Sequence, residues 1–410
     1  MNPTARRRAK RLIALAIAAL LVWIAARTVP WRDQIRLHWQ KGGPEQVWQG
    51  DLLGPWQADA VDFRLDEDVP APFVGAPDLR AGSQLLVHGQ GLRIEGESLE
   101  AWQVEWRPSL PRVLRELRWT TLAAALGLLF LSTLVIITRW QILLQVAGCP
   151  TRWFKVLHVT YVGLFFNLIL PGVSGGDLAR AYYMVKGHPE RRAAAVMSVF
   201  MDRVLGLFAM ALVASVAIYW NDERMASLRL PVLGVTAAMA LGGLVLIHPW
   251  LRKHLPVERL ISRLPAADKL QSLDDAVRLY GHHPVAVGVS ILLSMVNHMA
   301  ASTALFLLGR AMGDTHGLLD YVCVSTIMNT LSAVPLSPGG LGVGEVLAGS
   351  LLKLAGGSYT IGVAASITYR LCMFFLGLLG GLGLLVPGGT DIGKEFRQAE
   401  EQGEGFAAPS

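Results

Sequence analysis

Charged residues and cysteines are both scarce in this chain of 410 residues. Only 17% of the residues are charged and 52% are hydrophobic, whereas typical soluble domains carry about 25% charged residues. This shortage excludes an ordinary soluble globule and favours a protein whose solvent is a lipid bilayer. The three cysteines, Cys149, Cys323 and Cys372, have no metal-ligand spacing. We therefore expect no disulfide framework, no metal site and no cofactor.

The positions of the basic residues predict which loops of the chain face the cytoplasm. The formal net charge is +6, and Lys and Arg collect in short segments between apolar runs, as they do in cytoplasmic loops. We therefore expect no nucleic-acid partner. The segments expected in the cytoplasm are 139–155, 186–192, 251–283 and the residues after 387, and the outer loops are 221–230 and 309–317. This pattern predicts a multi-pass protein of the inner (cytoplasmic) cell membrane with both termini in the cytoplasm.

The N-terminal residues 1–30 have the layout of a membrane anchor. A basic cluster at 6–11 (RRRAKR) precedes an apolar run over 12–26. A signal peptide has the same layout and stays an alternative. Because no convincing small-residue cleavage site follows the run, we expect a retained transmembrane anchor.

Residues 31–118 form a polar insert between the anchor and the later apolar segments. Val61, Phe63 and Leu65 alternate with polar neighbours, and residues 92–94 and 102–106 do the same. Alternation with a period of two predicts short β-strands. We therefore expect a small β-rich extracytoplasmic domain in an otherwise helical protein.

Apolar segments resume at Trp119, which sets the transmembrane domain at 119–388 and leaves 389–410 as a cytoplasmic polar tail. A spanning helix needs ~20 apolar residues. The candidate segments are 119–138, 155–170, 193–220, 231–250, 284–308, 318–334 and 359–386.

Two of these segments run into stretches rich in glycine and proline, residues 171–177 (PGVSGGD) and 335–345 (PLSPGGLGVGE). Broken backbone at membrane depth is tolerated only where protein or water covers it. We interpret both as re-entrant hairpins that enter from opposite sides. The predicted fold is an all-α polytopic membrane protein with about six spanning helices and two opposed re-entrant hairpins. Seven or eight full spans are the alternative.

The two broken segments resemble each other beyond their glycines. Three matched pairs flank the breaks: Asn167 and Asn329, Asp177 and Glu345, Arg203 and Arg370. The acid-to-arginine separations are nearly equal, 203 − 177 = 26 and 370 − 345 = 25. Since the charge pattern puts the two halves in opposite orientations, we read an inverted repeat, which in many transporters builds a midplane substrate site.

Depth makes the two arginines candidates for function. At 1.5 Å per residue, Asp202 and Arg203 lie roughly 14 Å into their span and Arg370 roughly 16 Å into its own. A charge at that depth costs at least ~2.5–3.5 kcal/mol, so it faces a partner or a wet cavity. Guanidinium groups beside helix starts favour a phosphate. The alternative is that the arginines pair with carboxylates only to lock helices together.

Arg180, one turn after Asp177, either joins this site or pairs with Asp177 in its own helix. The full set of candidate substrate-binding residues is Asn167, Gly175, Gly176, Asp177, Arg180, Asp202, Arg203, Asn329, Gly339, Gly340, Glu345 and Arg370.

The order and spacing of these motifs resemble the lysylphosphatidylglycerol synthase transmembrane-region family, a flippase-like module that also occurs in the multiple peptide resistance factor. The resemblance covers about residues 115–388. It implies a polytopic fold that moves a lipid between leaflets, such as an anionic phospholipid, an aminoacyl-phospholipid or a polyprenyl-phosphate glycolipid. After Pro387 only a short polar tail follows. We therefore expect a transporter-like protein and no synthase activity.

Two other functions stay open at this point. One is an intramembrane lipid transferase that uses Asp177, Asp202 or Glu345 as a general base. The other is a non-transporting partner of a cell-envelope lipid enzyme, which the β-rich insert recruits. The sequence leaves the identity of the lipid, the direction of transport and the oligomeric state open.

Overall fold

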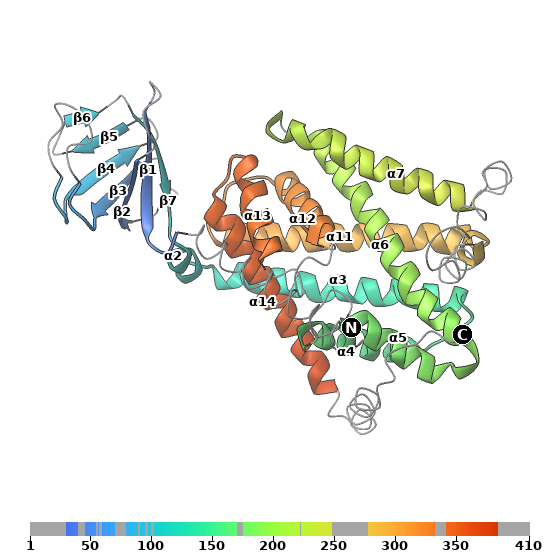
Figure 1. The fold of residues 1–410 in the computed structure, drawn as a ribbon. Helices are drawn as coiled ribbons and strands as arrows, with labels where there is room; N and C mark the ends of the chain where they lie inside the picture. Colours follow the sequence, from blue (N-terminus) through green and yellow to red (C-terminus); the bar gives the residue numbers. More distant parts are fainter. Residues whose placement is uncertain are drawn as a thin grey trace, which may run out of the picture.

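The computed structural model describes residues 30–39, 46–54, 56, 60–69, 79–88, 91–94, 97–99, 102–169, 175–221, 223–247, 278–332 and 342–383. Several predictions lie outside these residues: the anchor in 1–30, the centres of both glycine-rich breaks, most of the loop 251–283 and the tail. Within them, the chain forms one antiparallel sheet joined to a bundle of helices (Figure 1).

The sheet has seven antiparallel strands in the order β6-β5-β4-β3-β2-β1-β7. Its strands are β1 (Asp33–Trp39), β2 (Gln46–Leu53), β3 (Ala60–Leu65), β4 (Gln84–His88), β5 (Gly91–Ile94), β6 (Glu97–Leu99) and β7 (Trp102–Arg107). In β3 every second side chain is buried, as a period of two requires. The strands predicted near 61–65, 92–94 and 102–106 are confirmed as β3, β5 and β7.

A short helix, α2 (Leu110–Arg115), joins the sheet to the bundle. The alternation in the insert gave no sign of this helix. Its position depends on Asp33, which is 5% exposed and accepts hydrogen bonds from the amides of Leu52 (3.0 Å) and Ser109 (2.6 Å) and from Arg112 Nη1 (2.8 Å). One buried carboxylate therefore fixes the end of the sheet against the start of the bundle.

The bundle consists of α3 (Trp119–Val146), α4 (Trp153–Ile169), α5 (Gly175–Gly187), α6 (Arg192–Trp220), α7 (Arg229–Ile247), α11 (Pro284–Ala311), α12 (Leu318–Ser332), α13 (Val343–Leu354) and α14 (Tyr359–Gly383). Among the described residues, five helices are long and apolar enough to cross a membrane: α3, α6, α7, α11 and α14. The polytopic helical fold is thereby confirmed. The sixth predicted span is the N-terminal anchor, which lies outside the described residues, so the exact number of spanning helices stays a prediction.

Helices α3 and α11 lie side by side and antiparallel along the bundle (Figure 1). At one end the Arg118 amide donates to the Ala311 carbonyl at 3.1 Å. At the other end Tyr280 Oη donates to the Leu143 carbonyl at 3.0 Å. The start of each helix therefore meets the end of the other.

The other helices pack around α3 and α11 in two groups with matching contacts. Helix α4 packs against α5 and α14, and α12 packs against α13 and α6. Helix α5 also packs against α6, as α13 does against α14. Exchanging α3–α6 with α11–α14 therefore maps each of these contacts onto another. Because α3 and α11 are antiparallel, this pattern is that of the inverted repeat read from the sequence.

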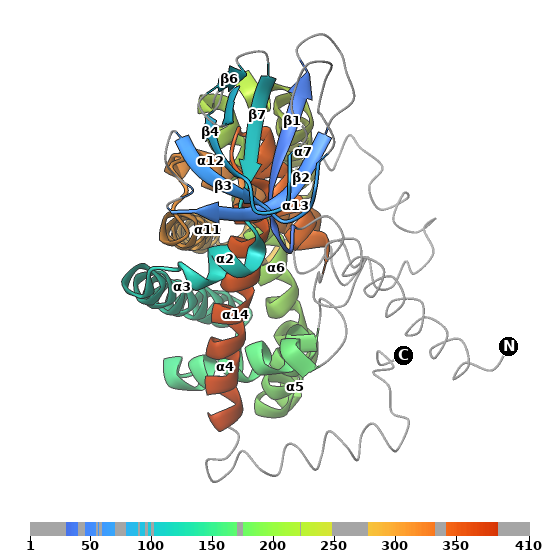
Figure 2. The same cartoon turned by 90° about the vertical axis from the view of Figure 1, so that its left-hand side faces the viewer.

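The short helices form two pairs, α4 with α5 and α12 with α13. Each pair starts and finishes at the same end of the bundle, and the two pairs use opposite ends. Thr151 Oγ1, just before α4, lies 3.1 Å from His188 Nε2, just after α5. In the other half, Asp320 near the start of α12 accepts from Asn221 at the end of α6 (3.1 Å), and Ala355 just after α13 accepts from Arg224 (3.1 Å). Seen from the sheet (Figure 2), α12 and α13 lie behind the strands and α4 and α5 lie away from them.

Candidate functional site

A buried ion pair ties α3 to α6 at the centre of the bundle. Arg139 Nε donates to Asp202 Oδ1 at 2.9 Å, and Arg139 Nη1 donates to Ser294 Oγ in α11 at 2.6 Å. Asp202 is 2% exposed and Arg139 6%. The expectation that residue 139 begins a cytoplasmic loop is wrong: α3 continues to Val146, because Asp202 compensates the charge that seemed to end the apolar run.

Arg180 binds the same carboxylate from the other side. Its Nη2 donates to Asp202 Oδ2 at 3.0 Å, and its guanidinium carbon lies 3.8 Å from the centre of the Trp140 ring, which adds a cation–π contact. Arg180 is 8% exposed, and its Nε has no hydrogen-bond partner among the described residues. Its Nη1 also lies 3.5 Å from Asp177 Oδ1, so the expected pairing with Asp177 within one helix is present.

Asp177 continues this network to Arg203, whose Nε donates to Asp177 Oδ2 at 2.5 Å. The result is a linked series of five charged side chains: Arg139, Asp202, Arg180, Asp177 and Arg203. It holds three cations and two carboxylates, so its formal charge is 3 − 2 = +1. We refer to it as the charged series; it starts in the core and ends at the half-exposed Arg203.

The second half of the chain holds the matching pair. Arg370 Nε donates to Glu345 Oε1 at 2.7 Å, and the Gly342 amide donates to Glu345 Oε2 at 2.7 Å. Glu345 is the third residue of α13, as Asp177 is the third residue of α5. The sequence match between Asp177–Arg203 and Glu345–Arg370 is therefore also a match in contacts.

Arg203 and Arg370 occupy the same position in their helices, and both side chains are partly exposed. Arg203 lies 203 − 192 = 11 residues from the start of α6, and Arg370 lies 370 − 359 = 11 residues from the start of α14. Their side chains are 42% and 35% exposed, whereas their carboxylate partners are 18% and 8% exposed. Both side chains are therefore only partly covered, although each guanidinium contacts a carboxylate.

The described asparagines and glycines beside the breaks form hydrogen bonds with other residues of the chain. Asn167 Oδ1 accepts a hydrogen bond from the Gly176 amide at 2.7 Å, which closes α4 onto the start of α5 next to Gly175. In the other half, Asn329 Nδ2 lies 3.4 Å from Ser325 Oγ in its own helix. Gly339 and Gly340 lie outside the described residues. Among the described residues, the Gly176 and Gly342 amides thus already donate within the chain.

Gly176 also allows α4 and α5 to touch. A Cβ atom at this position would lie 2.3 Å from the Gly163 carbonyl oxygen of α4. The second half has a close glycine contact at a different crossing, since a Cβ on Gly362 of α14 would lie 2.5 Å from the Ala348 carbonyl oxygen of α13. Small residues at such crossings let membrane helices approach closely. Residue type at these positions is therefore set by packing.

These observations define the class of protein: a multi-pass helical membrane protein with a two-fold internal repeat and arginine–carboxylate pairs between its helices. The profile of the family described as the lysylphosphatidylglycerol synthase TM region matches residues 102–381. The chain belongs to this family, as its motifs suggested. The match begins in β7, the last strand of the sheet.

Two archaeal relatives are similar over most of their length. The UPF0104 membrane protein PH1989 of Pyrococcus horikoshii is 21% identical over 276 residues, which cover 62% of this chain and 82% of the relative. A UPF0104 membrane protein of Methanothermobacter thermautotrophicus is 22% identical over 296 residues, which cover 66% of this chain and 86% of the relative. Both names describe membrane proteins, which agrees with the helical bundle.

Proposed function

We propose that this chain is a flippase-like translocator that moves a phosphate-bearing lipid headgroup between the leaflets of the cell membrane. The observation that carries the proposal is the exposure of Arg203 and Arg370, 42% and 35%, near the middle of two apolar helices. A guanidinium does not face bare hydrocarbon at that depth. The exposed surface is therefore where a polar path or an anionic group lies.

A phosphate fits the charges of this path. The charged series carries one more cation than it has carboxylates, and guanidinium groups bind phosphate oxygens with two parallel hydrogen bonds. Carrying an anionic headgroup through hydrocarbon requires desolvation of its charge. Arg203 and Arg370 would compensate that charge at two points, while Arg139 and Arg180 hold the carboxylates of the first half in place.

The paired short helices supply the movement in this proposal. Helices α4–α5 begin and end at one end of the bundle and α12–α13 at the other. We interpret them as the two opposed re-entrant hairpins predicted from the sequence. Alternate opening of the two pairs would expose the headgroup first to one leaflet and then to the other.

Transbilayer exchange in liposomes tests the proposal. The purified chain is placed in phosphatidylcholine vesicles that contain a trace of acyl-chain-labelled phosphatidylglycerol, and the label reachable from outside is followed over time. We expect exchange faster than in protein-free vesicles, and no acceleration for labelled glucosylceramide, a neutral lipid without phosphate. A rate equal to that of protein-free vesicles for the phospholipid would contradict the proposal.

Deleting residues 35–112 distinguishes a translocator from the alternative function, a non-transporting partner of a cell-envelope lipid enzyme. If the bundle itself moves lipid, the shortened chain keeps basal exchange in vesicles, because the charged series lies wholly in α3, α5 and α6. If the sheet recruits an envelope enzyme and the bundle only anchors it, neither the full chain nor the shortened chain accelerates exchange.

A further inference from the structure

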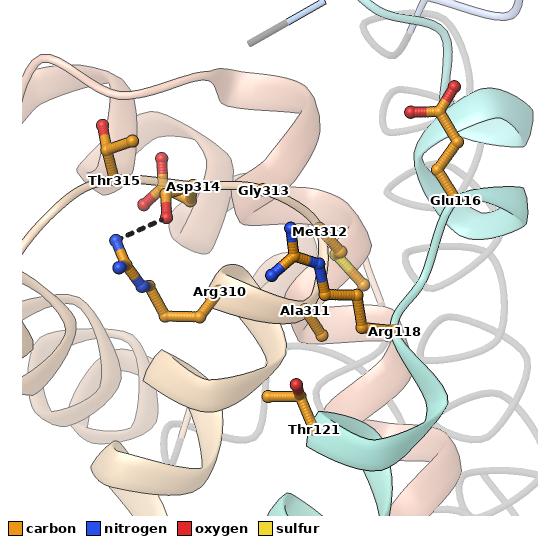
Figure 3. A pocket seen from close by; sticks show the side chains of 9 residues that line it. All are labelled: Glu116, Arg118, Thr121, Arg310, Ala311, Met312, Gly313, Asp314 and Thr315. Carbon is orange, nitrogen blue, oxygen red and sulfur yellow. Dashed lines mark hydrogen bonds between the residues drawn. The ribbon is translucent and has the colours of Figure 1, made fainter. Parts of the chain in front are cut away.

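A second polar feature lies outside the charged series, at the junction between the sheet and the bundle. It is a pocket of about 500 Å³ lined by Glu116, Arg118, Thr121 and residues 310–315. Figure 3 shows Glu116 and Arg118 on the side of α2 and α3, and Arg310 with the loop after α11 on the other side. We refer to it as the junction pocket.

The two arginines of the junction pocket have no carboxylate partner among the described residues. Arg118 makes no side-chain hydrogen bond or ion pair there. Arg310 Nη1 donates to the Asp314 carbonyl oxygen at 3.0 Å, and its guanidinium lies 5.9 Å from the Phe306 ring. Arg139, Arg180, Arg203 and Arg370 differ, because each of them is bound to a carboxylate.

The acidic residues of the pocket are bound to other partners. Glu116 Oε1 lies 3.0 Å from Arg112 Nε, one turn earlier in α2. Asp314 is 6% exposed; its Oδ1 lies 3.0 Å from His316 Nδ1 and its Oδ2 accepts from Tyr321 Oη at 2.7 Å. The hydrogen bond to Asp314 raises the pKa of His316. The formal charges of the two arginines and the two carboxylates therefore cancel, but neither carboxylate pairs with Arg118 or Arg310 among the described residues.

The pocket also lies at the ends of two candidate membrane spans, which is where lipid headgroups are expected. It is placed between the first residues of α3 and the last residues of α11, two helices long and apolar enough to span a membrane. Trp119, next to Arg118, is 76% exposed, and tryptophan is enriched at membrane–water interfaces. Hydroxyl groups of Thr121 and Thr315 also line the pocket, and hydroxyls can donate hydrogen bonds to phosphate oxygens.

We propose that the junction pocket is a binding site for a phosphate ester, held between Arg118 and Arg310. A lipid headgroup and a small soluble phosphate ester share this chemistry. The observation that favours it is that one pocket is lined by two arginines, whose guanidiniums can each bind phosphate oxygens in a bidentate manner. The proposal does not depend on lipid translocation, because no residue of the charged series lines the pocket.

Binding to the full chain in nanodiscs tests the site with two probes. The first is glycerol 3-phosphate added to phosphatidylcholine nanodiscs and followed by calorimetry. The second is phosphatidylglycerol mixed into the nanodiscs and counted by native mass spectrometry. We expect Arg118→Gln and Arg310→Gln each to weaken binding about tenfold or more, since hydrogen bonds to charged groups are strong. Arg310→Lys should fall between them and the wild type, because a lysine keeps the charge but lacks the fork.

Arg115→Gln is the matched control, because Arg115 is an exposed arginine at the end of α2 and does not line the pocket. It should leave both measurements unchanged. Loss with both probes in the Arg118 and Arg310 variants supports a general phosphate site, and loss with the lipid alone supports a headgroup site. Equal binding in wild type, Arg115→Gln, Arg118→Gln and Arg310→Gln would overturn the proposal, as would a wild type that binds neither probe.

Discussion

Replacing Arg203 or Arg370 with alanine is expected to reduce phosphatidylglycerol exchange to the rate of protein-free vesicles. Each variant removes a half-exposed guanidinium from the middle of an apolar helix, and with it a charge that compensates the headgroup during crossing. Arg192→Ala is the matched control, because Arg192 is an exposed arginine at the start of the same helix α6. It should keep the wild-type rate.

The carboxylate partners distinguish substrate binding from helix locking. If Arg203 serves only to hold Asp177, then Asp177→Asn loses the same ion pair and should be as inactive as Arg203→Ala. If Arg203 binds the headgroup, Asp177→Asn keeps the guanidinium and retains measurable exchange. Glu345→Gln and Arg370→Ala make the same comparison in the second half. Equal losses in both members of each pair would contradict the proposed role of the arginines.

Replacing Asp202 with alanine is expected to give the largest loss of stability. The variant leaves Arg139 without a carboxylate partner among the described residues and leaves Arg180 with Asp177 as its remaining carboxylate contact. Breaking a buried ion pair from one side costs about 3–5 kcal/mol. The free energy of unfolding in mixed micelles measures this cost. Asp202→Asn should lose less, because its amide oxygen still accepts one hydrogen bond.

A double variant identifies the cause of that loss. Combining Asp202→Leu with Arg139→Leu removes the carboxylate together with the most deeply buried cation, so the double variant should be more stable than Asp202→Ala alone. If Asp202→Ala unfolds within about 0.5 kcal/mol of the wild type, as a surface substitution does, the charged series is not what joins α3, α5 and α6.

Sequence patterns predicted the long elements well because burial in a bilayer leaves a strong signal. Apolar length located α6, α11 and α14 within a few residues of their bounds. The acid–arginine spacing also identified the two pairs that the structure brings together. These features depend on residues within one helix or between neighbouring helices, where spacing along the chain translates directly into position.

Arg139 shows what the sequence could not give. A single arginine at the end of an apolar run is typical of a loop, and only the distant Asp202 makes it a helix residue. The weak local signal was the continued apolar spacing of Trp140, Leu143 and Leu144, all fully buried. The junction pocket was missed for the same reason, since Arg118 and Arg310 are far apart along the chain and meet only because α3 and α11 are antiparallel.

The lipids retained by the purified protein test most directly whether Arg203 and Arg370 hold a phosphate-bearing lipid. They are extracted and identified by mass spectrometry in a background of Arg118→Gln with Arg310→Gln, so that the junction pocket does not contribute. We expect a phosphate-bearing lipid enriched over its share of the source membrane, and its loss when Arg203→Ala or Arg370→Ala is added. The same lipids in the same amounts with and without the two arginines would contradict the account.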